Sequence, residues 1–488
     1  EGRWTGPLSR QDQQDCYDVV EWAAAQSWSS GRVGMIGTGF AGKLQPLVAA
    51  LQPPHLAAIL PIEVVDDLYL DSYPGGTVSD INYPLCSYIP TIDSISEAEL
   101  ENSPAVLREM LRQAREQPEI ATNSYYYRGL DSWPPRHYTW NVDILLHPLD
   151  GAFWRHRSLR DRAQHINVPV YAMSFYTEFG RSTAGAVNLF ADPDLQVPKK
   201  LLLIDPLTEK CLPFAKVDLE ALRWYDHWLK GIDTGLMDEP PVKYWVMGEN
   251  KWRTGQDWPL PETVWTPYYL HSWEKLDTKG HLPATETYVN EPPDAFVQMP
   301  PTQTNKIARL RYMTAPLAED TLVAGPISLT LYASLDEDDT NWIVILKDVG
   351  PDVSVQTARI GERDVPADLF ERELTRGWLK ASYRTVDPER SKPGRPWHYL
   401  TPDKIQPVVP GEVNEYQIEI LSTANMFKAG HRICIDITSL DLSEGVAGET
   451  AVEYIGAHVC SSKTVVHKVF HNHQYPSHLL LPAIPITC

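Results

Sequence analysis

The sequence is short of positive charge and contains no long apolar run. Its 488 residues include 43 Lys and Arg against 64 Asp and Glu, which gives a formal net charge of −21 at pH 7. Nucleic acids and anionic membrane surfaces need a basic face on their partner, so this balance argues against both. No apolar stretch is long enough to span a membrane, and no secretory signal peptide is visible. We interpret the acidic surplus as favouring solubility.

Cysteine is also scarce, and its spacing carries no known signature. Six Cys residues are scattered along the chain without a C-x-x-C pair, so the sequence predicts neither a zinc site nor a disulfide framework. A reduced, cytoplasmic setting fits this usage better than secretion. The run His471-Asn472-His473 looks like a metal pair, but no third ligand is evident. We therefore expect no metal and no cofactor.

A third absence concerns the G-x-S-x-G motif, which occurs nowhere in the chain. Residues 32–42 read R-V-G-M-I-G-T-G-F-A-G: an apolar strand, a glycine-rich corner and the start of a helix. That is the setting of a nucleophile elbow, the turn that lifts a catalytic Ser out of a sheet. Position 39, where the Ser would stand, is Gly. The sequence predicts the elbow without its nucleophile.

The remaining composition and periodicity predict a large chain of two or three domains. It is 43% hydrophobic and contains 16 Trp, enough to build large cores. From Val242 onward, short alternating strands with Gly and Pro turns indicate an all-β sandwich. Before that point, hydrophobic spacing predicts helices at 11–26, 43–51, 96–117 and 219–230, and strands at 33–36, 56–61, 166–173 and 201–204.

Several stretches carry a specific resemblance. They are Tyr17–Trp22, Gly31–Met35, His55–Pro61, Asp67–Tyr69, Tyr244–Arg253, Gly325–Ser328, Phe427–Arg432 and Pro476–Pro482. Together they make the chain similar to the cocaine-esterase/X-prolyl dipeptidyl-peptidase (CocE/NonD) family of serine hydrolases. The resemblance covers nearly the whole chain. It implies an α/β-hydrolase domain with an inserted helical cap, followed by a C-terminal all-β jelly roll.

Mapped onto this sequence, that architecture gives four segments. Residues 1–70 and 161–238 form the α/β-hydrolase domain, 71–160 the helical cap, and 239–488 the jelly-roll sandwich. An α/β-hydrolase normally has several strands before the elbow, whereas little sequence precedes it here. We therefore expect N-terminal strands of the domain to be missing from this sequence.

The resemblance also shows where the catalytic triad should be, and none of its three residues is present. The nucleophile position matches Gly39, the acid position matches Thr177 and the His position matches Glu209. Glu178 could replace the acid only if the turn differs by one residue. Other candidates carry less weight: Ser182 is best interpreted as a helix N-cap. Cys211 has no matched His, and His227 stands where the family has no catalytic residue. The histidines near the cap, His147, His156 and His165, are interpreted as structural.

A site without a nucleophile can still bind, orient and move protons. We expect Thr38, Gly39, Phe40, Thr177 and Trp140 to contact substrate. Trp140 belongs to an aromatic cluster in the cap that suits an apolar or flat ligand. For acid/base or hydrogen-bonding duty we favour Glu209, then Tyr176 and Glu178, against the alternative that Glu209 only fills vacated space in a salt bridge.

Three functions remain open at this point. The first is a non-hydrolytic enzyme that cyclises, isomerises or eliminates within an apolar small molecule such as a natural-product intermediate, with a Diels–Alder step as one example. The second is a catalytically dead pseudohydrolase that only binds its ligand. The third is a serine esterase or acyl transferase whose nucleophile was changed to Gly39. The oligomeric state is left open, with a homodimer as one option.

Overall fold

The computed structural model describes residues 6–78, 102, 104–116, 140–176, 182–204, 217–285, 291–300, 303–304, 306–351, 371–440 and 463–486. The chain divides into two compact units. The first comprises Glu1–Asp71, Gly151–Thr263 and Ser422–Met426, and the second comprises Ser72–Asp150, Val264–Leu421 and Phe427–Cys488. Each unit is described by itself.

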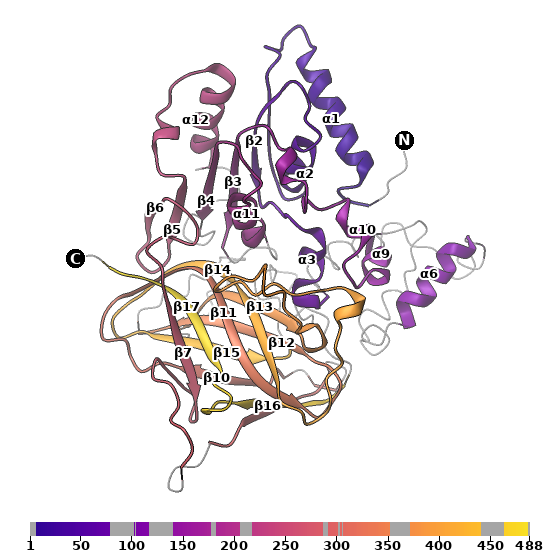
Figure 1. Cartoon of the computed structure of the whole chain (residues 1–488). Helices are drawn as coiled ribbons and strands as arrows, with labels where there is room; N and C mark the ends of the chain where they lie inside the picture. Colours follow the sequence, from indigo (N-terminus) through magenta and orange to yellow (C-terminus); the bar gives the residue numbers. More distant parts are fainter. Residues whose placement is uncertain are drawn as a thin grey trace, which may run out of the picture. The chain divides into compact units, whose positions relative to one another are not determined.

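The first unit is built on a six-stranded sheet in the order β1-β2-β3-β4-β5-β6 (Figure 1). The strands are β1 (Val33–Thr38), β2 (Leu56–Ile62), β3 (Val170–Phe175), β4 (Lys199–Ile204), β5 (Val242–Val246) and β6 (Lys251–Gly255). The first five are parallel and β6 is antiparallel to β5. Strands β2 to β4 are predominantly apolar and buried along almost their whole length, as expected for parallel strands covered on both faces.

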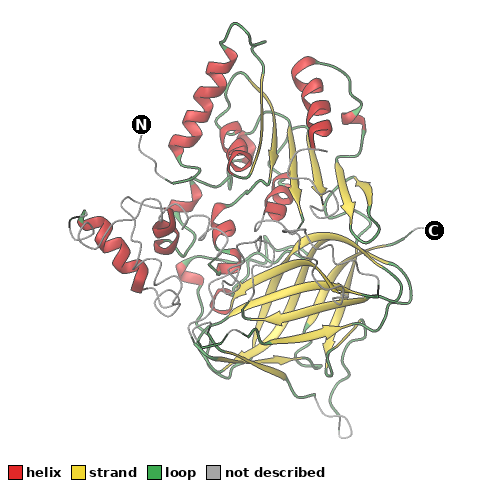
Figure 2. Cartoon of the chain, turned by 180° about the vertical axis from the view of Figure 1, so that it is seen from behind, coloured by secondary structure: helices red, strands yellow, loops and turns green. Residues whose placement is uncertain are grey.

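Helices pack around this sheet, and three of them correspond to the helices predicted at 11–26, 43–51 and 219–230. They are α1 (Arg10–Ala24), α2 (Phe40–Ala49), α3 (Leu68–Ser72, at the boundary between the units), α10 (Ala152–Arg155), α11 (Ser182–Ala191) and α12 (Val217–Lys230), with short 3-10 turns η2 (Ala163–His165) and η3 (Leu236–Asp238). In both views, α1 and α12 flank the strands from opposite sides (Figures 1 and 2).

Local sequence explains where the two longest of these helices begin and end. At the start of α1, Ser9 and Asp12 form a capping box, in which each side chain bonds the other's backbone N–H. At the end of α12, Gly231 has φ +70° and donates to the carbonyl of His227. Within α12, Trp224 is fully buried against apolar side chains of β2, β3 and β4.

The second unit is dominated by an eleven-stranded assembly that is antiparallel except for the parallel pairing of β8 with β10 (Figure 2). Its strands are β7 (Val264–His271), β8 (Lys275–Asp277), β9 (Asp294–Gln298), β10 (Arg309–Met313), β11 (Thr321–Leu335), β12 (Asn341–Val349), β13 (Glu371–Lys380), β14 (Asn414–Phe427, shared with the first unit), β15 (Arg432–Thr438), β16 (Val465–Phe470) and β17 (His478–Ile484). An additional pairing between β14 and β11 joins two distant parts of the strand order, which reduces exposed strand edges. Alternating inward residues around Trp342, Tyr416 and Phe427 form its core.

Helical segments also occur in the second unit, in the stretch of sequence between β2 and β3. They are η1 (Pro74–Gly76), α6 (Ala105–Glu116) and α9 (Trp140–Leu146), while η4 (Ala381–Tyr383) and η5 (Pro402–Lys404) lie further along the chain. The predicted helix at 96–117 is represented by α6, and the greater part of its first turns lies outside the described residues. In η1, the two glycines are packed against the β-rich core: a Cβ on Gly75 would lie 2.0 Å from the carbonyl oxygen of Trp378.

Two findings refine the expectations from composition. Composition shifts towards an all-β pattern at Val242, where β5 begins. Nevertheless, β5 pairs with β4 and β6 pairs with β5, so both belong to the six-stranded sheet. Composition alone does not report which sheet a strand joins. Within the described ranges, no helix is long and apolar enough to cross a membrane.

Candidate active site

The predicted elbow is present between β1 and α2. Gly39 connects the two elements with φ +61° and ψ −124°, and its carbonyl accepts the N–H of Lys43 at 2.8 Å in the first turn of α2. A positive φ is strained for any residue with a Cβ, and such strain is typical of the elbow that exposes a nucleophile. The backbone therefore keeps the geometry of a nucleophile position although residue 39 has no side chain.

The neighbouring glycines explain why this corner can be so tight. A Cβ on Gly42 would lie 2.0 Å from the carbonyl oxygen of Ile62, and one on Gly37 would lie 2.6 Å from the Cβ of Ala41. Both distances are far inside van der Waals contact, so these positions need Gly for packing. At Gly39 the situation is reversed. Among the described residues, a Cβ there would meet only Glu63, whose Oε2 lies 4.0 Å away.

Glu63 is the feature of this site that sequence reasoning missed. It directly follows β2, and its N–H donates to the carbonyl of Met173 in β3 at 2.9 Å. Its backbone has φ +57°, a conformation that non-Gly residues rarely adopt. The residue is only 9% exposed, and within the described ranges its carboxylate has no hydrogen-bond or ion-pair partner. The one available signal was its place at the carboxyl end of a predicted strand beside the elbow strand.

Charges near Glu63 modify its proton affinity. Burial raises the pKa of the Glu63 carboxyl, the positive charge of Lys43 opposes that rise, and the negative charge of Asp71 adds to it. Lys43 and Asp71 form their own ion pair, with Nζ 2.7 Å from Oδ2, and Asp71 is 3% exposed. Because Lys43 is already paired with Asp71, it leaves the Glu63 carboxylate without a direct counterion.

Two further features surround the elbow. The Thr38 hydroxyl is buried, and no hydrogen-bond partner is found for it in the part of the chain that the structure describes. The first N–H groups of α2, beginning with Phe40, have no acceptor within the helix because the i→i−4 pattern starts only with Lys43. The Phe40 side chain is 49% exposed. The corner thus combines backbone donors, a hydroxyl and a carboxylate.

All of these groups lie where the parallel strands end at their carboxyl termini, which we call the carboxyl edge of the sheet. Thr38 is paired with Ile62 in the parallel register of β1 and β2, so Gly39 and Glu63 continue from neighbouring strand ends. Further along, Tyr176 follows β3 and donates its N–H to Ile204 at the end of β4, at 2.8 Å. Ligands of open α/β sheets bind outside the carboxyl ends of the strands. This edge is therefore the candidate active site.

The other predicted site residues have different outcomes. Tyr176 is present at the sheet edge, but it is only 1% exposed, and its role in acid/base chemistry stays a prediction. Glu209, Glu178 and Thr177 lie outside the described residues, as does Cys211. Trp140 is the first residue of α9 in the second unit, and its side chain is likewise outside what is described. Ser182 opens α11, which fits a helix start, and its side chain is not described.

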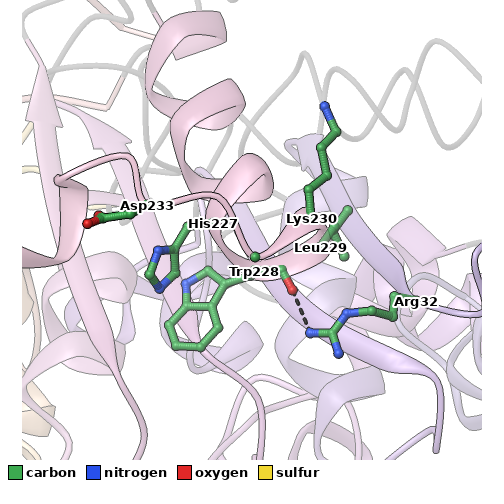
Figure 3. A pocket seen from close by; sticks show the side chains of 7 residues that line it. Arg32, His227, Trp228, Leu229, Lys230 and Asp233 are labelled. Carbon is green, nitrogen blue, oxygen red and sulfur yellow. Dashed lines mark hydrogen bonds between the residues drawn. The ribbon is translucent and has the colours of Figure 1, made fainter.

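A surface pocket of about 450 Å³ lies in the same unit, beside Arg32 at the amino-terminal end of β1 (Figure 3). It is lined by Arg32, His227, Trp228, Leu229, Lys230, Gly231 and Asp233. Arg32 directly precedes β1, and its guanidinium donates to the carbonyl of Trp228 at 2.5 Å. That bond satisfies an orphan acceptor at the C-terminus of α12, so the cluster has a structural explanation. We do not assign the activity to this pocket.

The histidine pair that resembled a metal site serves other contacts in the second unit. His471 is fully buried, with Nδ1 3.4 Å from Glu291 and Nε2 3.1 Å from Asp294. His473 is exposed and its Nδ1 lies 3.3 Å from the carbonyl oxygen of His281. In the described part of the chain, no three His, Cys, Asp or Glu side chains are arranged to hold a metal ion.

Two family profiles match most of the chain. The X-Pro dipeptidyl-peptidase (S15 family) profile matches residues 1–203, and the X-Pro dipeptidyl-peptidase C-terminal non-catalytic domain matches residues 234–479. Among curated proteins, cocaine esterase from Rhodococcus sp. (strain MB1 Bresler) is 25% identical, covering 97% of this chain and 84% of its own. A putative serine esterase from Mycobacterium bovis is 26% identical, covering 88% of this chain and 74% of its own.

Solved structures give a consistent picture. A CocE/NonD family hydrolase from Staphylococcus aureus has a TM-score of 0.71 at 21% identity, covering 98% of this chain and 77% of that chain. An α-amino acid ester hydrolase has a TM-score of 0.67 at 18% identity, covering 98% of this chain and 82% of that chain. At these identities the similarity carries the fold and not the activity.

Proposed function

Because this chain belongs to the cocaine-esterase/X-Pro dipeptidyl-peptidase family of α/β-hydrolases, we propose that its elbow site hydrolyses carboxylic esters. Its architecture is that of the family, an α/β-hydrolase domain with an inserted cap and a C-terminal all-β domain. The relatives named above are esterases and peptidases, all of which transfer an acyl group to water. The observation that carries the proposal is the retained elbow backbone at Gly39.

The proposed site lacks the covalent step of its family. Gly39 has no side chain, so no acyl-enzyme can form on residue 39. Thr38, Gly39 and Phe40 would form the floor on which the ester lies. The N–H of Phe40, at the start of α2, is placed to donate to the developing oxyanion, the role that the residue after the nucleophile has in this fold. Binding and orientation can themselves lower the barrier by several kcal/mol.

The relatives do not support the first expectation from the sequence, a cyclisation, isomerisation or elimination on a natural-product intermediate. They favour the esterase alternative instead. Glu209, Glu178 and Thr177 remain proposed lining residues, because they follow strands β3 and β4 in the sequence and these strands end at the same sheet edge. An apolar acyl or alcohol group on the ester is our proposal for the substrate.

Hydrolysis of a graded set of nitrophenyl esters, from acetate to longer acyl chains, tests the proposal. We expect saturable release of nitrophenol above the buffer rate. We also expect a serine-directed fluorophosphonate probe neither to label residue 39 nor to stop turnover. Ester analogues that bind, as seen by calorimetry, without any ester being hydrolysed would overturn the proposal and favour the pseudohydrolase alternative.

A further inference from the structure

We propose that Glu63 acts as the general base for a water molecule held beside Gly39, so that the ester is cleaved in a single displacement. The inference rests on the proposed ester hydrolysis and adds its nucleophile and its base.

The distance between Glu63 and residue 39 suits a water molecule. Glu63 Oε2 lies 4.0 Å from the position that a Cβ on residue 39 would take, and beyond the adjoining chain at residues 38–43 no other described residue lies within that distance. A water oxygen hydrogen-bonded to Oε2 would stand about 2.8 Å from it, in the region that the side chain of residue 39 would otherwise fill. The absence of a side chain at Gly39 thus makes room for the nucleophile that a Ser would have supplied.

Glu63 carries two costs that a purely structural residue would avoid. The residue as a whole is only 9% exposed, and within the described ranges its carboxylate accepts no hydrogen bond from the protein. A largely buried carboxylate without a protein partner is unfavourable unless water or a ligand satisfies it. Its backbone is also held at φ +57°, a conformation that is strained for a residue with a Cβ. Strain and unsatisfied polarity at one residue beside the elbow indicate a functional position.

The surrounding charges keep Glu63 available as a base. Among the described residues, the titratable groups that act on it are Lys43 of α2 and Asp71 of α3, and these two form an ion pair with each other. Burial raises the pKa of Glu63 above its ordinary value. A general base works best when its pKa is near the operating pH, so this shift improves the carboxylate as a proton acceptor.

The reaction balances without any further reactant than water. The water oxygen attacks the ester carbonyl carbon while the Glu63 carboxylate takes one of its protons. The N–H of Phe40 donates to the oxyanion of the tetrahedral intermediate. The bond between the carbonyl carbon and the alcohol oxygen then breaks, and the leaving alkoxide takes the proton from Glu63. The products are a carboxylic acid and an alcohol, and Glu63 returns to its carboxylate form.

The test compares Glu63→Gln with Glu262→Gln, which changes an exposed carboxylate in the same unit. We expect Glu63→Gln to lower kcat for nitrophenyl ester hydrolysis by about 100-fold or more, with KM nearly unchanged. It should also remove the acidic limb of the pH–rate profile, which in the original protein reports ionisation of Glu63. Glu262→Gln should leave both the rate and the profile unchanged.

A second variant protects the test against misfolding of the first. Gly39→Ala would place a methyl group where the water stands and should lower kcat to a similar extent. Gly235→Ala is the matched control, because Gly235 also has a positive φ (+65°) and a Cβ there meets no atom within 4 Å. If no ester is hydrolysed by the original protein, the proposed function itself fails. If esters are hydrolysed and either Glu63→Gln or Gly39→Ala, shown to be folded by circular dichroism, keeps its rate within a few-fold, the role of Glu63 is wrong while the esterase function stands.

Discussion

Glu63 Oε2 lies 4.0 Å from the point where a Cβ on residue 39 would stand, and beyond the adjoining chain at residues 38–43 no other described residue approaches that point as closely. The relationship joins the end of β2 to the turn after β1, two neighbouring strand ends of one parallel sheet. It places an acid without a hydrogen-bond partner among the described residues next to a nucleophile position without a nucleophile. The following predictions test what this arrangement does and what it costs the fold.

Restoring a hydroxyl at the elbow should change the kinetics rather than improve them. In Gly39→Ser, the Ser Oγ would occupy the space beside Glu63 and could attack an activated ester with Glu63 as its base. Because the water is displaced, the acyl group on Ser would no longer be hydrolysed efficiently. We expect one rapid turnover that leaves an acyl group on the protein, followed by slow turnover, measured by stopped-flow absorbance and intact mass. Sustained turnover faster than that of the original protein would contradict a site adapted to water.

Removing the Glu63 charge should stabilise the folded protein at neutral pH. The pKa of Glu63 is raised in the folded state, so its stabilising contribution is complete below the ordinary carboxyl pKa and is lost as pH rises through the folded value. Above that value, folding must bury the charged form. We expect Glu63→Gln to unfold at higher urea concentration than the original protein at pH 7.5, and the difference to shrink towards pH 5. A lower urea midpoint at pH 7.5 would show that the carboxylate is stabilised by a partner.

Gly42 of the elbow should tolerate a methyl group far less well than Gly151, which directly precedes α10. In Gly42→Ala, the new methyl group would lie 2.0 Å from the carbonyl oxygen of Ile62, so α2 and β2 would have to separate. We expect a loss of at least about 2 kcal/mol in the free energy of unfolding. Gly151→Ala, with no atom within 4 Å, should change it by less than about 0.5 kcal/mol. Urea denaturation of both variants measures these free energies of unfolding. Equal values for Gly42→Ala and Gly151→Ala would contradict the tight packing of α2 against β2.

Acid sensitivity of the β-rich unit should depend on His467. Its ring is fully buried, stacks on Phe296 at 4.2 Å, and its Nε2 lies 2.8 Å from the hydroxyl of Thr340. Burial lowers the pKa of His467 to about 4, against 6.5 when exposed. The unfolded chain therefore binds more protons between these values, and stability is lost as pH falls from about 6.5 towards 4, by up to about 3 kcal/mol.

Replacing this histidine should make unfolding less dependent on pH. We expect the urea midpoint of His467→Asn to change less between pH 7 and pH 5 than that of the original protein. The exposed His473 supplies the matched control, and His473→Asn should keep the original pH dependence. An unchanged pH dependence in His467→Asn would mean that His467 does not titrate differently on folding.

The scaffold was predictable from the sequence because it is encoded locally. The Gly spacing at 37, 39 and 42 fixes the elbow, and the apolar runs of β2, β3 and β4 identify strands buried on both faces. The family motifs then supplied the α/β-hydrolase domain and the all-β domain that the solved relatives share. Strands β5 and β6 were harder to place, since a short strand carries no local mark of the sheet it joins.

The candidate site was only partly predictable, and the reason is physical. Thr38, Gly39 and Phe40 follow from the motif itself. Glu63 depends on the register between β1 and β2 and on a positive φ, neither of which leaves a pattern in the sequence. Sequence reasoning concentrated on replacements at the triad positions, such as Glu209, and so overlooked a carboxylate on the neighbouring strand end.

The central claim is that water, and not a side chain of the protein, attacks the ester. Rapid-quench mass spectrometry of the original protein during turnover of a nitrophenyl ester tests it directly. We predict that the protein mass stays unchanged at every time point while acid and alcohol accumulate together. An added acyl mass on any residue during turnover would contradict the account.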